Sequence, residues 1–350
     1  MKSIYNLDRE GLVSYLKSIN EPAFRATQIF EWLYEHRVEA FAEMTNLSQK
    51  LRDQLEKDFV INTLKLKTKQ VGHDETTKFL LECEDGALIE TVLMKQPYGY
   101  SVCLTTQVGC AMGCKFCASG LLKKNRNLYT GEIMNQIMFA QRFLDAQNKR
   151  VSHIVLMGIG EPFDNYRYVM RFLNLVNDEK SLNIGARHIT ISTSGIAPVI
   201  KRFADEESQV NLAISLHAPN NALRSSIMPV NDMFNLEELF DALHYYQDKS
   251  NRRLTFEYIL IKDVNDQLEH AQQLVELIKG MNAYVNLIPY NEVAENPFRP
   301  SSRNQSMRFL RHLNENGIQA TIREEKGGDI DAACGQLRAK AEKAKRGQRS

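Results

Sequence analysis

The spacing of apolar residues changes along the chain, and each spacing predicts one kind of element. In the first sixty residues apolar positions recur at helical spacing. The predicted helices span residues 9–18, 23–36 and 48–59. From residue 63 to about residue 94 the period is two, and Glu84-Asp85-Gly86 is a hairpin turn signal between strands predicted over 76–83 and 87–94. Residues 1–95 are therefore expected to form a small α+β accessory domain, either packed on the main domain or docking RNA.

From residue 100 onward, short apolar runs alternate with longer stretches of helical periodicity. The predicted strands span residues 101–106, 152–157, 188–193, 211–216, 254–260, 284–288 and 319–323. The predicted helices span residues 131–146, 165–177, 235–247, 267–280 and 303–316. This repetition is typical of a parallel sheet with crossover helices. The expected fold class is α/β, with a partial (β/α)6 barrel over residues 96–337.

Composition narrows the class of protein. At 350 residues, with 43% hydrophobic and 25% charged residues, the chain can bury a large core. The first ten residues contain no apolar signal-peptide core, and no run approaches the length of a membrane span. Six cysteines, half of them clustered, do not make a secreted disulfide framework. These features predict a cytoplasmic protein with no membrane partner.

Charge limits where a nucleic acid could bind. The net charge is +1, from 44 basic and 43 acidic residues, so any such surface must be local. A tail over residues 338–350 holds six basic residues against Glu342 alone, and such a run is usually solvated. Further basic residues lie close to a cluster of cysteines, at Lys115, Lys123, Lys124 and Arg126. Phosphate contacts from these groups would give affinity without sequence information.

That cluster, Cys110, Cys114 and Cys117, is the strongest chemical signal in the chain. Three thiolates spaced by three and two residues can hold three irons of a [4Fe–4S] cube, which normally has four cysteine ligands. One iron then stays open. A structural zinc site is the main alternative, but it is almost always closed by four ligands, and no fourth Cys or His lies nearby. Three unrelated thiols are the other alternative.

The Cys-x3-Cys-x2-Cys spacing, with Phe116 just before the last cysteine, resembles the loop of the radical S-adenosylmethionine (SAM) enzymes. That resemblance implies a partial barrel and an open iron that chelates the amino and carboxylate groups of SAM. An electron from the cluster then breaks a carbon–sulfur bond and yields a 5′-deoxyadenosyl radical. The protein's own part is to position the two cofactors.

Polar and glycine-rich residues follow the predicted strands, and parallel barrels place their sites at that end. By physical role, Glu161 after Gly160 would accept hydrogen bonds from the SAM ammonium, and Ser192 and Asn291 would bind its ribose or carboxylate. The adenosine would be lined by Ser215, Leu216 and His217. Each position also has a purely structural explanation. Glycine and proline after a strand often form turns, a lone histidine is usually hydrogen-bonded within the fold, and Asn291 could be a helix cap.

Taken together, these motifs resemble the dual-specificity 23S rRNA adenine-C2 methyltransferases, over residues from about 21 to 337. The residues that carry the resemblance are Val108-Gly-Cys110 to Cys117, Gly160-Glu161-Pro162, Ser192-Thr-Ser-Gly195, Ile214-Ser-Leu-His217-Ala-Pro219, Val285-Asn-Leu-Ile-Pro289-Tyr-Asn291 and Asp329-Ile-Asp331-Ala-Ala-Cys334-Gly-Gln-Leu337. The implied substrates are an adenine in the peptidyl-transferase centre of 23S rRNA and the adenine 3′ to the anticodon in some tRNAs. The implied reductant is a donor such as flavodoxin, and we expect a monomer.

The resemblance also implies a sulfur relay. One SAM methylates Cys334, and a second SAM at the cluster supplies the radical, so that two SAM molecules serve each turnover. The methylene radical formed on Cys334 adds to C2 and gives a protein–RNA adduct. By the family's pattern, Glu90 is the proton acceptor, and Cys103 forms a disulfide with Cys334 as product leaves.

From the residues alone, Cys334 lies in a glycine-rich loop where a buried structural cysteine is less expected. Cys103 could simply belong to the barrel interior, and Cys83 is interpreted as hairpin core. Two alternative functions stay open. One is methylation at C8 of the same rRNA adenine, which confers antibiotic resistance and which Pro162 disfavours, since the C8 relatives tend to have alanine there. The other is a noncatalytic RNA-binding module with a structural iron–sulfur or zinc site.

Overall fold

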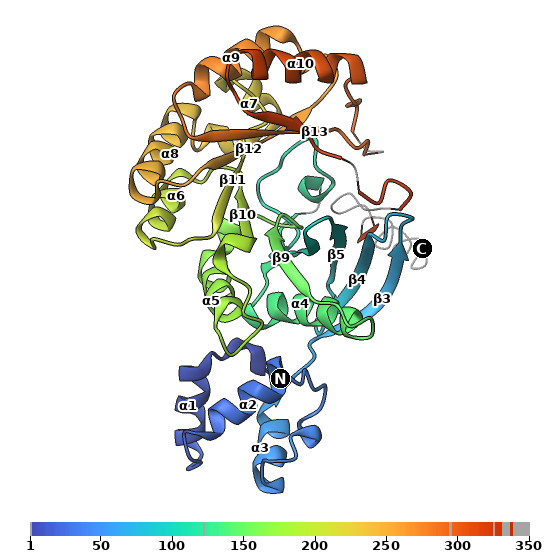
Figure 1. Cartoon of the computed structure of the whole chain (residues 1–350), viewed down its shortest axis with the longest axis vertical. Helices are drawn as coiled ribbons and strands as arrows, with labels where there is room; N and C mark the ends of the chain where they lie inside the picture. Colours follow the sequence, from blue (N-terminus) through green and yellow to red (C-terminus); the bar gives the residue numbers. More distant parts are fainter. Residues whose placement is uncertain (1, 122, 294–295, 325, 331–336, 339–350) are drawn as a thin grey trace.

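The computed structural model describes residues 2–121, 123–293, 296–324, 326–330 and 337–338. One ten-stranded sheet organises most of this chain, in the order β14-β13-β12-β11-β10-β9-β6-β5-β4-β3 (Figure 1). Its strands are β3 Leu64–Val71, β4 Thr77–Cys83, β5 Leu88–Gln96, β6 Gly99–Cys103, β9 Val151–Leu156, β10 Ile189–Thr193, β11 Asn211–Ser215, β12 Leu254–Leu260, β13 Ala283–Pro289 and β14 Ala320–Ile322. From β6 to β14 neighbouring strands pair in parallel, which confirms the predicted α/β class.

Helices cover the outer face of the parallel strands (Figure 1). They are α4 Thr130–Asp145, α5 Tyr166–Asn177, α6 Ala197–Asp205, α7 Asn221–Ile227, α8 Leu236–Ser250, α9 Leu268–Ile278 and α10 Arg303–Glu315. Their ends carry sequence-encoded caps: Asn235 accepts from the Glu238 N–H at 2.9 Å, and the Glu238 carboxylate accepts from the Asn235 N–H at 3.1 Å. Each helix of the part that the structure describes is too short or too polar to span a membrane.

The three strands β3, β4 and β5 extend the main sheet. They pair antiparallel with one another, and β5 pairs antiparallel with β6, with Val92 opposite Cys103. The predicted domain limit at residue 95 therefore falls inside β5, one residue before its end at Gln96. A domain division at that position stays a prediction, while the backbone ladder crosses it without a break.

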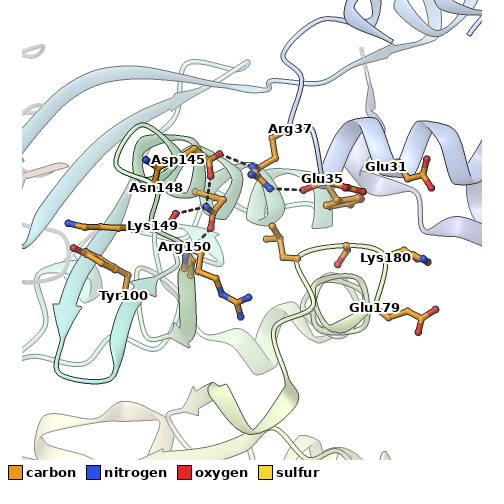
Figure 2. Close-up of a pocket in the computed structure, with 15 residues that line it drawn as sticks. Glu31, Glu35, Arg37, Tyr100, Asp145, Asn148, Lys149, Arg150, Glu179 and Lys180 are labelled. Atoms are coloured by element: carbon orange, nitrogen blue, oxygen red, sulfur yellow. Dashed lines mark hydrogen bonds and ion pairs between the residues drawn. The ribbon is translucent and has the colours of Figure 1, made fainter. Parts of the chain in front are cut away.

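The N-terminal helices α1 Arg9–Ser18, α2 Arg25–Tyr34 and α3 Gln49–Asp58 lie together at one end of the molecule (Figure 1). They attach to the barrel through α4, where the Asn6 side chain accepts from the Gly131 N–H at 2.8 Å. Arg37 donates to Asp145 at 2.7 Å across the same junction, as Figure 2 shows. The contact fixes where the helical bundle sits relative to the barrel.

A large polar groove of about 850 Å³ opens at this junction (Figure 2). It is lined by acidic and basic side chains, including Glu31, Glu35, Lys149, Arg150 and Lys180. Mixed charge of this kind does not favour one class of ligand. None of the catalytic, metal-binding or cofactor-binding residues predicted from the sequence and described in the structure lines this groove.

Candidate active site

The three clustered cysteines line one cavity of about 270 Å³, which lies where the barrel strands end. Their loop begins after the short strand β7 Gln107–Val108, and the Lys115 N–H donates to the Ile227 carbonyl at 2.9 Å. Gly120 closes the loop. A Cβ atom at Gly120 would lie 2.5 Å from the Cys114 carbonyl oxygen, so only glycine lets the two backbones approach this closely.

Burial keeps the Cys110 and Cys114 thiols protonated when no metal compensates their charge. It raises the pKa of Cys110 to about 12, and it also raises the pKa of Cys114, where the neighbouring thiols Cys117 and Cys110 add to the effect. Iron would reverse this, because a metal binds the thiolate and displaces the proton. The donor set thus fits an iron–sulfur cluster with an open corner.

Two further observations bear on the fit. The Ser119 hydroxyl is buried in the same cavity and has no hydrogen-bond partner within the described residues, so a polar group placed there would satisfy it. Among those residues, no three His, Cys, Asp or Glu side chains are grouped so as to hold a single metal ion. The fit to the cluster therefore depends on the donor set and on the shape of the loop.

Gly160 and Glu161 face the cysteines from the loop after β9. Gly160 has a positive φ of 106°, and a Cβ there would lie 2.6 Å from Cβ of Gln107. The buried Glu161 carboxylate accepts from the Ser194 N–H at 2.7 Å and from the Phe163 N–H at 3.0 Å. Burial raises the pKa of Glu161, and these hydrogen bonds oppose the rise. One carboxylate thereby joins the loops that follow β9 and β10.

Ser192, Ser215 and His217 complete the far wall of this cavity. The two serine hydroxyls lie 3.4 Å apart, at the ends of neighbouring strands. His217 has a φ of 58°, and its Nδ1 accepts from the Ile259 N–H at 3.1 Å, so the neutral ring carries its proton on Nε2. Its ring meets Phe116 edge-on at 4.9 Å between centroids. His217, one of the predicted adenosine-lining residues, thus contacts the cysteine loop directly.

The pKa of His217 is lowered to about 3, mainly by burial and secondarily by Arg224. The unfolded state should therefore bind more protons between about pH 6.5 and pH 3. Stability is complete above that window and is lost as pH falls through it, by at most about 1.4 kcal/mol per pH unit.

His217→Asn should weaken this dependence, because asparagine tolerates a positive φ and does not titrate. Urea unfolding of both proteins at pH 7 and pH 5 would measure the difference. Equal losses of unfolding free energy in the two proteins would contradict the assignment.

Leu216 and Asn291, unlike the other predicted cofactor-binding residues, do not line the cavity that contains the three cysteines. The Leu216 side chain is part of the apolar core, while its N–H donates to the Glu257 carbonyl at 3.1 Å. Asn291 is exposed and lines a second cavity rather than the first. It follows β13 at this end of the barrel, and the serines line the other cavity.

Arg224 of α7 is a site residue that the sequence did not reveal. Its side chain is fully buried, and it donates to the Ser194 carbonyl at 2.6 Å, the Leu216 carbonyl at 3.2 Å and Asn231 Oδ1 at 3.0 Å. Burial lowers its pKa to about 10. By holding two carbonyls from the loops after β10 and β11, Arg224 fixes the spacing of those loops under the cavity.

Glu257 of β12 is a second such residue. It is buried, lines the cavity, and accepts from Asn286 Nδ2 at 2.9 Å. Burial raises its pKa, while the charge of Arg323 and the Asn286 hydrogen bond oppose the rise. The signal was present in the sequence, since a single acidic residue interrupts the apolar strand Leu254–Leu260.

A second cavity of about 260 Å³ adjoins the first and contains Cys103. Six residues line both cavities: Phe116, Cys117, Met157, Ile259, Ile288 and Arg323. Val92 and Met94 of β5 face Cys103 of β6 in this second cavity. A reacting group that enters here would lie between the cysteine loop and the Cys103 thiol.

Glu90 of β5 is buried on the same face as Val92 and Met94, because residues two apart along a strand share a face. Its carboxylate forms an ion pair with Lys78 at 2.7 Å and accepts from the Arg338 N–H at 2.7 Å. Arg338, assigned from sequence to a solvated tail, is in fact buried. Cys334 lies outside the described residues, four positions before Arg338 in sequence.

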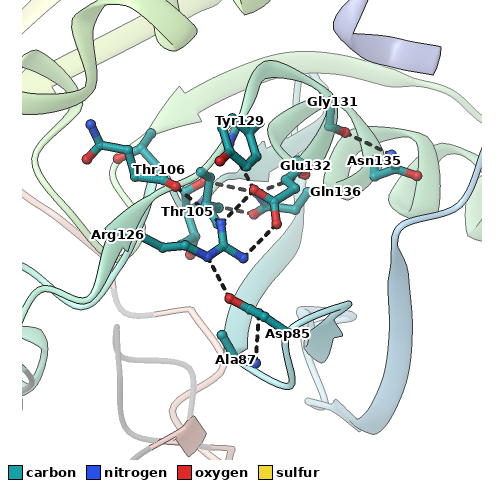
Figure 3. A network of polar contacts seen from close by, with 12 residues as sticks. Asp85, Ala87, Thr105, Thr106, Arg126, Tyr129, Gly131, Glu132, Asn135 and Gln136 are labelled. Carbon is teal, nitrogen blue, oxygen red and sulfur yellow. Dashed lines mark hydrogen bonds and ion pairs between the residues drawn. The ribbon is translucent and has the colours of Figure 1, made fainter. Parts of the chain in front are cut away.

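Lys124 and Arg126, suggested as phosphate contacts, have acidic partners in the fold. Arg126 makes a two-pronged ion pair with Glu132, each bond 2.8 Å long, and reaches Asp85 at 2.7 Å (Figure 3). Lys124 donates to Asp164 at 2.6 Å. These contacts join the segment after the cysteines to the β4–β5 turn and to α4, so both side chains have a structural role.

The sequence matches known families along most of its length. Residues 2–61 match the ribosomal RNA large subunit methyltransferase N-terminal domain, and residues 104–278 match the radical SAM superfamily. A probable dual-specificity RNA methyltransferase RlmN of Halalkalibacterium halodurans is 58% identical over 343 residues, which cover 98% of this chain and 95% of that protein. A protein of the same name from Staphylococcus aureus strain JH9 is 56% identical over 339 residues, or 97% and 93% of the two chains.

A solved structure agrees. The crystal structure of a radical SAM methyltransferase from Sphaerobacter thermophilus superimposes with a TM-score of 0.93 at 42% sequence identity, over 96% of this chain and 99% of that one. Identity at this level over nearly whole chains shows common ancestry as well as a common fold. The chain therefore belongs to the RlmN family of dual-specificity RNA methyltransferases, within the radical SAM superfamily.

Proposed function

We propose that this protein methylates C2 of an adenine in the peptidyl-transferase centre of 23S rRNA and of the adenine 3′ to the anticodon in some tRNAs. The observation that carries the proposal is the pair of adjoining cavities, with the cysteine loop in one and Cys103 in the other. Chemistry that needs both a radical source and a separate thiol fits this arrangement. The names of the relatives support an RNA substrate.

Members of the radical SAM superfamily use a [4Fe–4S] cluster and SAM, and Cys110, Cys114 and Cys117 would hold the cluster. When bound, the cluster supplies the electron that cleaves SAM. Glu161 would orient the SAM ammonium through the loop that it fixes, and Ser192 and Ser215 would receive polar groups of the same ligand. Gly160, Leu216 and His217 would shape the surrounding pocket, and Asn291 would act from the second cavity.

The sulfur of Cys334 would carry the methyl group between SAM and the RNA. The Cys334 thiolate displaces the methyl group from a first SAM, so that the new S–CH₃ bond forms as the sulfonium C–S bond breaks. A second SAM starts the radical step, after which the carbon on Cys334 is bonded to C2 of adenine. This order explains why two SAM molecules serve one turnover. The segment after Cys334 supports it, because Leu337 packs on Leu80 and Leu88, beside Glu90.

Release would need a base and a second thiol. The adduct would lose the unpaired electron left by radical addition, which the oxidised cluster would take up. Glu90 accepts the C2 proton, directly or through one water, since a general base must be within hydrogen-bond reach. The Cys103 thiolate then attacks the Cys334 sulfur, the electrons of the breaking S–C bond go to the methylene carbon, and that carbon takes up a proton to become the methyl group. The products are methylated RNA and a Cys103–Cys334 disulfide, which a cellular reductant restores.

The remaining proposals concern partners. Residues 1–95 and the tail at 338–350 would contribute to RNA docking around residues 96–337, and the target adenine would leave its stack, as base-modifying enzymes require. The electron donor would be flavodoxin or a protein like it, and the enzyme would act as a monomer.

Anaerobic reaction with SAM, reductant and an rRNA fragment, followed by mass spectrometry of the nucleosides, tests the proposed function. We expect 2-methyladenosine together with 5′-deoxyadenosine. Product with methyl at C8 alone would overturn the C2 assignment. Stoichiometric zinc, no sulfide and no deoxyadenosine would instead favour a noncatalytic RNA-binding module.

A further inference from the structure

A fully buried lysine lies beside the proposed base. Lys78 of β4 has no exposed surface, and its Nζ lies 2.7 Å from Glu90 Oε2, whose side chain is 3% exposed. A buried ammonium is costly unless it is paired, and a buried carboxylate is costly for the same reason. Surface solubility therefore does not explain this ion pair. Its neighbours in the sheet suggest what it does.

The strand register places this ion pair on the face that lines the second cavity. Lys78 is opposite Val92, and Val92 is opposite Cys103. Cross-strand partners share a face, and so do residues two apart on one strand. Lys78, Glu90 and Cys103 are thus carried on one face of three adjacent strands. Neighbouring Thr91 points the opposite way and donates to Gln136 of α4 at 2.9 Å.

The Glu90 carboxylate is held at both oxygens. Oε2 meets Lys78, and Oε1 accepts from the Arg338 N–H. The backbone of Glu90 is fixed as well, because the Thr105 hydroxyl donates to its carbonyl at 2.6 Å. The carboxylate of the proposed base therefore also binds the backbone of Arg338, which follows Cys334 in sequence.

We propose that Lys78 is a positioning residue for the methyl-transfer reaction, one that supplies the counter-charge of Glu90 and holds its carboxylate aimed along the cavity face while residues 337–338 dock on the same carboxylate. The inference rests on the proposed role of Glu90 as the proton acceptor. A buried carboxylate needs an opposite charge or hydrogen bonds to compensate for the water that it loses. The Lys78 ammonium at 2.7 Å supplies that charge without exposing the site to water.

Other charged groups also lie near this face. Glu82 of β4 pairs with Lys67 at 3.1 Å, and the Arg338 guanidinium is buried with its residue. Arg126 and Glu132 pair with each other on the opposite side of the sheet, at α4. Of these described groups, Lys78 is the cation in direct contact with the Glu90 carboxylate. Its removal should thus act on Glu90 first.

Lys78→Met tests the inference in the full-length, cluster-loaded enzyme. A buried carboxylate that loses its counter-charge takes up a proton, so resolution of the protein–RNA adduct should fail near pH 7 and recover at higher pH. The pH of half-maximal resolution is expected to rise by about one to three units, the usual effect of one adjacent opposite charge. Single-turnover reactions across pH, with gel analysis of the adduct, measure this shift. Formation of 5′-deoxyadenosine should persist throughout.

Thr91→Val is the matched control, because it removes a fully buried polar group from the same sheet on the other face. It should leave the pH profile of resolution unchanged. The double variant Lys78→Met/Glu90→Gln removes both charges, and it should melt at a higher temperature than Lys78→Met because it leaves no unpaired buried charge. Continued formation of 5′-deoxyadenosine by Lys78→Met shows that the single variant is folded.

The outcomes separate the role of Lys78 from that of Glu90. If Glu90→Gln resolves the adduct at the normal rate, the assignment of the base fails, and the role of Lys78 fails with it. If Glu90→Gln is blocked while Lys78→Met keeps the pH profile of the unaltered enzyme, only the role of Lys78 is wrong. A raised midpoint in Lys78→Met together with a blocked Glu90→Gln supports both.

Discussion

Cys334→Ala is expected to abolish RNA methylation completely. Without a sulfur at this position there is no carrier for the methyl group, and adenine C2 is not nucleophilic enough to take it from SAM directly. The cysteine loop should keep its iron and sulfide, because Cys110, Cys114 and Cys117 are unchanged. Mass spectrometry of the RNA nucleosides, with iron and sulfide analysis of the same preparation, measures both effects.

Cys83→Ala provides the control for that experiment. Cys83 is buried in the core at the end of β4, where burial raises the pKa of its thiol to about 12 and makes it unreactive. Its removal should cost some stability and leave methylation in place. Any methylated RNA from Cys334→Ala would refute a covalent carrier at this residue.

Cys103→Ala should give the second large effect, a protein–RNA adduct that forms and does not resolve. The thiol lies on β6 in the cavity that adjoins the cysteine loop, so its loss leaves the radical step intact and removes the group that attacks the Cys334 sulfur. Turnover should fall below detection. A denaturing gel with labelled RNA would show the adduct as a slower band that carries the label.

The same Cys83→Ala protein is the control, because it also lacks one buried thiol. It should give free methylated RNA and no stable band. Free product from Cys103→Ala at the rate of the unaltered enzyme would remove Cys103 from the reaction.

Much of the fold could be predicted because its apolar periods are regular. The predicted helix over 9–18 and the predicted strand over 254–260 coincide with α1 and β12. The helices α6 and α7 were not predicted, since α7 has only seven residues and both are short for a periodic signal. Local spacing thus predicts long elements well and misses short ones that neighbouring elements stabilise.

The site was predictable where a motif sets chemistry and spacing together, as in the cysteine loop. It was not predictable where function depends on a buried charge. Arg224 and Lys78 have the residue types of a solvated surface, and each is buried because a partner distant in the sequence or a backbone carbonyl satisfies it. Such partners come from the tertiary fold, so sequence spacing carries no direct sign of them.

The continuous backbone ladder from β5 to β6 has a practical consequence for anyone shortening this enzyme. A truncated chain that starts at residue 96 would lack β3 and β4 and nearly all of β5, so the backbone N–H and C=O groups on that edge of β6 would be unpaired. Such an exposed edge strand can pair with other chains and cause aggregation. The truncation would also discard the carboxylate and ammonium that β5 and β4 carry. Trimming is safer ahead of Leu64, where the first of these strands begins.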